Sequence, residues 1–195
     1  MLLLSYAKRK TQEFDFSNIN YMQFLAPGLI VMAMMQNAFA NTSSSLLSSK
    51  IAGNIVDLLM PPFSANEIIL SYTLAAIIRA ILVGVITFLF VSSFVDLKLV
   101  NYFYFIYFSI GGCIFLSLLG IIAGVWAEKF DNMSGITNFI ITPLTFLSGT
   151  FYTVERLPDP FYTLCLLNPF YYVIEGFRNA FILNNSQYLF NGICY

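Results

Sequence analysis

Few residues of this chain have side chains suited to chemistry at neutral pH. The 195 residues include no histidine, which excludes Ser-His and Cys-His nucleophile pairs, histidine metal ligands and histidine proton shuttles. The cysteines Cys113, Cys165 and Cys194 lie too far apart to match a metal or redox motif, so we expect small packing residues. We therefore predict no catalytic residue, no metal site and no cofactor site in this chain.

The charged residues are also too few to cover a surface that faces water. Only 10% of the residues are charged and 58% are hydrophobic, whereas a soluble domain carries roughly 25% charged residues. Nine Lys and Arg residues against ten Asp and Glu residues leave a net charge of -1, which gives no basic patch for nucleic acid. The composition indicates a membrane protein whose surroundings are the lipid bilayer.

Four apolar runs are candidates to cross that bilayer, which takes about 20 residues of helix. They extend over about Tyr21–Leu47, Ala65–Val95, Tyr102–Trp126 and Ile136–Tyr152. Aromatic residues mark the ends of several runs, as expected where rings meet lipid headgroups. The loops between them are short. We predict an all-α fold, a polytopic and compact bundle of transmembrane helices.

A short amphipathic segment, SSKIAGNIVDLLMPPFS, lies between the first two runs. On a helix its apolar residues share one face and its polar residues lie elsewhere: Ile51, Ile55, Leu58 and Leu59 against Lys50, Asn54 and Asp57. Pro61 and Pro62 then end the helix. Such a helix either rests in the lipid interface or docks into a groove on a soluble partner, and the pattern alone leaves both open.

One charge, Arg79, interrupts the second run about twelve residues after its start near Glu67, roughly 18 Å along the helix. A charge at that depth costs several kcal/mol unless it pairs or faces water, so Arg79 is a candidate functional residue. The alternative is an arginine that snorkels or forms a structural pair. In the third run, Gly120 and Gly124 lie one turn apart, a spacing that favours close helix packing.

The chain after the fourth run predicts two helices too short to cross a bilayer. They are expected from Pro160 to Pro169 and from Phe170 to Leu183, and the break falls at Asn168-Pro169 because proline disfavours helix in the residue before it. Glu175 and Arg178 lie at i and i+3 on the second helix. We interpret the pair as re-entrant or interfacial helices, and an aromatic surface loop is the alternative.

These pieces, in this order, closely resemble the ABC-2 type permeases, the membrane subunits of bacterial exporters with a type V exporter-like fold. The resemblance covers about Met22 to Leu183 and rests on five stretches: NAFANTSSSLLSSK, KIAGNIVDLLMPPFS, AAIIRAILVG, WAEKFDNMSGITNFIITPLTFLSGTFY and LPDPFYTLCLLNPFYYVIEGFRNAF. It implies a transmembrane domain over residues 21–183 of a permease with six helices. Residues 1–20 would then be the remnant of a preceding helix and an outer loop, residues 184–195 the start of a truncated last helix, and the chain a fragment.

The resemblance also implies partners and roles. Residues 50–60 would be the coupling helix that docks on a separate ATPase subunit, through Lys50, Ile51, Ile55, Asp57, Leu58 and Leu59. Residues 157–183 would be re-entrant helices forming an outer gate with Pro169, Glu175 and Arg178. Two copies would form a homodimer in the bacterial inner membrane. The chain has no GxxxxGK[ST] motif, so ATP would act through the partner and the chain would be no enzyme.

Other functions remain open from the sequence. A scaffold or receptor of the same fold that transports nothing shares these features, and so does an inactive truncated permease. The cargo could be a drug, a polysaccharide or a lipid-linked glycan, because aromatic residues near the outer mouth suit sugars and the membrane interface equally.

Overall fold

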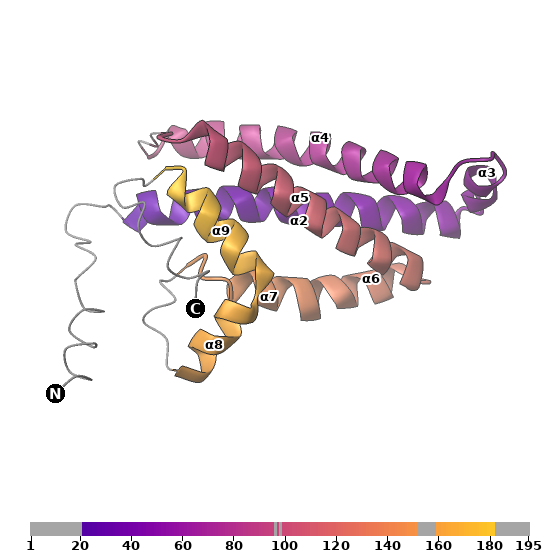
Figure 1. The fold of residues 1–195 in the computed structure, drawn as a ribbon. Helices are drawn as coiled ribbons and strands as arrows, with labels where there is room; N and C mark the ends of the chain where they lie inside the picture. The colour runs from indigo at the N-terminus through magenta and orange to yellow at the C-terminus, as the bar shows by residue number, and fades with distance from the viewer. Residues whose placement is uncertain (1–20, 96, 98, 152–158, 182–195) are drawn as a thin grey trace.

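The computed structural model of the chain describes residues 21–95, 97, 99–151 and 159–181, and its framework is a set of long helices. Three of them are long and apolar enough to cross a membrane: α2 (Tyr21–Ile51), α4 (Ala65–Ser92) and α5 (Tyr102–Trp126). They run side by side along the bundle (Figure 1). The described residues include no strand, and the predicted all-α class is confirmed.

The helix α2 lies at the centre and supplies most of the core. It contacts α4 and α5 along its length, and its side chains Val31, Met35 and Leu47 are fully buried. By contrast, α4 presents large apolar side chains outward, with Ile78 63% exposed and Ile86 66% exposed. Bilayer lipid is as apolar as these side chains, so a helix of this kind is stable with its outer face in the membrane.

The fourth predicted span differs from an uninterrupted α-helix. Three short helical segments follow one another here: α6 (Phe130–Ile136), the π-helical η1 (Thr137–Ile141) and α7 (Thr142–Phe146). Pro143 has no N–H to donate and crowds the carbonyl one turn earlier, and the wider π turn just before it accommodates that loss. The Thr142 hydroxyl donates to the Thr137 carbonyl five residues back, at 2.9 Å.

The amphipathic helix is shorter than the expected range of Lys50–Met60. The structure has α3 (Ile55–Leu59) there, and Lys50 and Ile51 are the last residues of α2. Gly53 turns the backbone between the two helices. Its φ is 77°, a left-handed conformation that glycine adopts without strain. Ile51 therefore does not continue the face of the helix that contains Ile55. In Figure 1, α3 stands at one end of the bundle.

Two helices, α8 (Asp159–Leu167) and α9 (Pro169–Asn179), follow the fourth segment. Asn168 separates them: its side-chain oxygen accepts a hydrogen bond from Phe170 N at 3.1 Å, and its amide donates to Leu144 O at 2.7 Å. α9 packs on the first half of α5 and on the first half of α2, far from α3. Two of the sequence predictions, on residues 1–20 and 184–195, lie outside the described residues.

Candidate functional site

The end of the bundle that holds α3 exposes a cluster of apolar side chains. Val56 is 54% exposed, Met60 78% and Phe63 59%, and Ile51 is 53% exposed at the end of α2. Ile55 is half-buried and Asp57 is exposed, while nothing is described of the Leu58 and Leu59 side chains. The sequence pattern missed Val56 on α3 and Met60, the C-cap of that helix, which lie one turn apart and are both exposed.

Lys50 connects this end of α2 to α5. Its ammonium group donates to the carbonyl oxygens of Val125 and Ala127, each at 2.7 Å, and of Gly124 at 3.4 Å. These carbonyls end α5 and have no intrahelical partner, and a cation is favourable at the negative end of a helix dipole. The predicted partner contact Lys50 thus binds within the chain, next to α3.

A polar face runs along the half of α2 nearest to α3. We call it the α2 polar face, and it consists of Asn37, Asn41, Ser44 and Ser48 on α2 with Arg79 on α4. Ser44, Ser48 and Arg79 are exposed, and the two asparagines are half-buried. In the other half of α2, the residues that are not buried are mostly apolar, with Gln36 and Gln23 as the polar exceptions. A membrane helix that carries such a face is expected to turn it toward water or protein rather than lipid.

Arg79 is held at the edge of this face by one hydrogen bond. Its Nη1 donates to Asn41 Oδ1 at 2.8 Å. One turn along α2, Asn37 Oδ1 is buried and has no hydrogen-bond partner. On the far edge of the face, Gln36 donates to the Thr145 hydroxyl of α7 at 3.3 Å. The α2 polar face therefore lies between α4 and α7. Arg79 could be identified from the sequence, but its partner Asn41 gave no sequence signal.

At the opposite end, Arg178 joins three parts of the chain. It is 5% exposed, and its guanidinium donates to Glu175 Oε2 at 2.7 Å and to Gly149 O at 3.0 Å. The same group lies 3.8 Å from the centre of the Phe24 ring on α2, a favourable cation–π distance. Burial lowers the pKa of Arg178 from its ordinary value, and the Glu175 carboxylate opposes that shift.

Pro169, the third residue predicted for this region, is the first residue of α9. Its ring suits the first helical position, because the N–H that proline lacks would have no partner there. Arg178 thus ties α9 to Gly149 in the turn at residues 147–150 and to the start of α2, and Glu175 pairs with its guanidinium. These contacts form a structural clamp.

The predicted packing glycines lie where α5 crosses α2. A Cβ on Gly120 would overlap the Thr42 hydroxyl and the Phe39 backbone, and one on Gly124 would lie 3.1 Å from Ser43 O and Leu46 Cβ. These glycines bring the two helix backbones together, as small residues do in membrane bundles.

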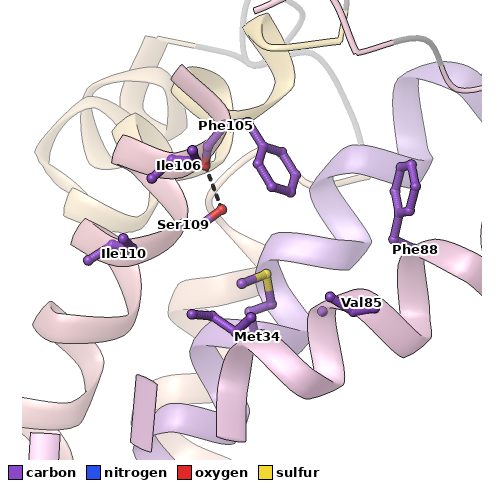
Figure 2. Close-up of a pocket in the computed structure, with 9 residues that line it drawn as sticks. Met34, Val85, Phe88, Phe105, Ile106, Ser109 and Ile110 are labelled. Carbon is purple, nitrogen blue, oxygen red and sulfur yellow. Dashed lines mark hydrogen bonds between the residues drawn. The ribbon is translucent and has the colours of Figure 1, made fainter. Parts of the chain in front are cut away.

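A cavity of about 190 Å³ opens between α2, α4 and α5. Figure 2 shows Met34, Phe88 and Phe105 around it, with Ser109 as the polar residue of its lining. The Ser109 hydroxyl donates to the Phe105 carbonyl in its own helix at 2.6 Å, the dashed line of Figure 2. No charged side chain lines the cavity. The described residues also include no cluster of three metal-ligating side chains. Neither the cavity nor the placement of these side chains indicates a reaction centre.

Comparison with known proteins identifies the family of the chain. The chain is similar to the inner membrane transport permease YadH of Escherichia coli strain K12, with 36% identity over 168 residues, 86% of this chain. The same identity and coverage relate it to the protein of that name in Shigella flexneri. The aligned part spans 66% of the length of these relatives. No solved structure matches the chain. The ABC-2 type transporter family matches residues 2–182, and the chain therefore belongs to that family.

Proposed function

We propose that this chain forms the membrane pathway of an ATP-driven exporter in the bacterial inner membrane. Two copies would work as a homodimer, each coupled to a separate ATPase subunit. The observation that carries the proposal is the pairing of a polar face inside the membrane with an exposed apolar helix at the end of the bundle, in a chain of the ABC-2 family. The chain would supply the path, and its partner would supply the energy.

In this proposal α3 is the coupling helix. An ATPase groove would take the exposed Val56 and Met60, with the predicted contacts Ile55, Leu58 and Leu59 from the same helix. A movement of α3 would be transmitted to α2 through the short turn at Gly53. It would be transmitted to α5 through the Lys50 hydrogen bonds. Closure of the ATPase pair would then shift two long helices together, a small rigid movement of packed elements.

The substrate path would run along the α2 polar face. Serine, asparagine and arginine side chains that face lipid destabilise a membrane helix. Two copies that turn these faces toward one another would enclose a water-accessible path and remove that cost. At the other end, α8 and α9, fixed by Arg178, would cap the path as the outer gate.

Affinity purification of the full-length permease from its own bacterium tests the coupling. The ATPase that is recovered in equal amount would be identified by mass spectrometry. We expect Val56→Glu and Ile55→Glu to lower its recovery roughly tenfold or more, because a buried charge in a docking groove costs at least about 1.4 kcal/mol.

Phe94→Glu is the matched control, since Phe94 is a large apolar residue that is 75% exposed just beyond the far end of α4. It should leave recovery unchanged. If no ATPase is recovered with the unaltered permease, or if all three variants recover it equally, the coupling assigned to α3 is wrong. A scaffold that transports nothing would give the first of these results.

A further inference from the structure

We infer that the exporter's cargo is an anionic amphiphile and that Arg79 binds its acidic group halfway across the membrane. This inference rests on the proposed function and names the substrate class of the α2 polar face. Arg79 lies at the midpoint of α4, which extends from Ala65 to Ser92, and its side chain is exposed. At about 1.5 Å per residue, it is roughly 21 Å from the start of the helix.

Among the described residues, Arg79 has a hydrogen-bond acceptor but no counter-ion. Asn41 Oδ1 holds one of its nitrogens at 2.8 Å and leaves the other side of the guanidinium exposed. Among the described residues, the ion pair in the structure is that of Glu175 with Arg178. A guanidinium offers five donors in a planar fork that fits a carboxylate or a phosphate. A large part of this binding capacity is unused.

The described carboxylates of a second copy would not provide the missing charge at this depth. The carboxylates whose side chains the structure describes lie at helix ends, in loops or in the Arg178 pair: Asp57, Glu67, Glu128, Asp131 and Glu175. Glu67, in the first turn of α4, accepts a hydrogen bond from its own N-cap, Ser64 N. A symmetric dimer of the α2 polar faces would instead bring two Arg79 residues toward one path. The positive charge of the two arginines would favour an anion from outside the chain.

The face around Arg79 also changes polarity at this depth. From Ser48 through Asn41 to Asn37 it is polar, which gives a charged group a solvated route from the α3 end. Beyond Asn37 the residues of α2 that are not buried are mostly apolar, with Gln36 and Gln23 as the polar exceptions. The apolar ones are Ala33, Leu29, Leu25 and Met22. A ligand that places its acidic group on Arg79 would lay its apolar part along this second half. That combination describes an amphiphile with one negative end.

Thermal unfolding of the full-length permease in a neutral detergent tests the inference without any ATPase. The probes are dodecyl phosphate, dodecyltrimethylammonium and dioctanoyl phosphatidylglycerol. We expect dodecyl phosphate to raise the melting temperature in a saturable way and the cationic probe to have no such effect. Arg79→Gln should weaken the phosphate response roughly tenfold or more, because hydrogen bonds to charged groups are among the strong ones.

Two further variants make the result specific. Asn41→Ala keeps the charge but removes the amide that orients it, so the response should weaken without disappearing, and this variant also serves if Arg79→Gln does not fold. Lys129→Gln removes an exposed cation outside the spans and should leave the response intact. A response that is the same in Arg79→Gln as in the unaltered protein, or that the cationic probe reproduces, overturns the inference.

The lipid probe identifies the source of the acidic group. Binding of dioctanoyl phosphatidylglycerol with the same dependence on Arg79 would assign the site to phospholipid-like cargo. Binding of dodecyl phosphate alone would assign it to cargo with a terminal acidic group. Because this assay requires no partner, a failure here leaves the ATPase coupling untouched. Loss of the ATPase in the purification experiment likewise leaves the anion site untouched.

Discussion

At the scale of single residues, the bundle depends on side chains that are absent as much as on those that are present. Gly120 lets α5 approach the backbone of α2 at Phe39, where any Cβ would overlap. Gly111, earlier in the same helix, has nothing within 4 Å of its Cβ position. Close approach of helices is a main source of stability in a membrane, because burial from water contributes little there.

We expect Gly120→Ala to lower the free energy of unfolding by about 1–3 kcal/mol, the usual cost of overpacking. Gly111→Ala should not destabilise the protein, because alanine is the better helix former and has room. Thermal unfolding of both variants in the same detergent measures the difference. Equal melting temperatures would refute the close packing described for Gly120.

The Glu175–Arg178 pair is the second prediction at this scale. Glu175→Gln removes the counter-charge of a guanidinium that is 6% exposed, and we expect a loss of about 1–3 kcal/mol. The double variant Glu175→Gln/Arg178→Met should lose less than the sum of the two single variants, because it leaves no buried charge unpaired. Additive losses in unfolding experiments would show that the two side chains do not depend on each other.

At the scale of helices, the main structural link joins the end of α2 to the end of α5, next to α3. Lys50 places its ammonium group on the last carbonyls of α5, so the end of α2 and the end of α5 are tied by hydrogen bonds from one side chain. The neighbouring α3 is joined to α2 by a three-residue turn. Movement of α3 and of these two helix ends is therefore expected to be coupled.

Lys50→Met should loosen the end of α5 while leaving the bundle folded. The carbonyls of Val125 and Ala127 lose a charged donor, so the last turn of α5 should fray, with faster amide hydrogen exchange than in the unaltered protein. Lys129→Met is the matched control, because Lys129 is exposed just beyond the same helix. Identical exchange in both variants would contradict the role given to Lys50.

The helices themselves could be read from the sequence to a large extent, and their contacts could not. The three long apolar runs became α2, α4 and α5 within a few residues, because length and hydropathy determine spans. The fourth run gave no signal for its π turn near Pro143, and the amphipathic pattern extended across Gly53, where the backbone turns. Helical periodicity presumes one continuous helix, so it placed Ile51 and Ile55 on a common face.

The candidate site, too, could be predicted from the sequence only in part. A charge inside a span is visible in the sequence, so Arg79 could be predicted. Its acceptor Asn41 is 38 positions away, and no local pattern connects the two. The same holds for Arg178, whose contacts with Gly149 and Phe24 depend on how distant segments pack.

At the scale of the whole molecule, the two ends of the bundle differ, and a polar face lies along one side. Exposed apolar side chains of α3 lie at one end, and α9 with its Arg178 clamp lies toward the other. The α2 polar face extends between them from the α3 end to the middle of α4. The central claim of the proposed function is that this face borders water, whereas the outer face of α4 borders lipid.

Cysteine accessibility in the full-length permease tests that claim most directly. In a background without native cysteines, Ser44→Cys lies about 10 Å inside the α3 end of α2, and Leu74→Cys, at a 57% exposed position, lies about 13 Å inside α4. Inside-out vesicles would be treated with a membrane-impermeant maleimide. We predict rapid labelling at position 44 and none at position 74. Equal labelling of the two, or a protected residue 44, would contradict a water-accessible path along α2.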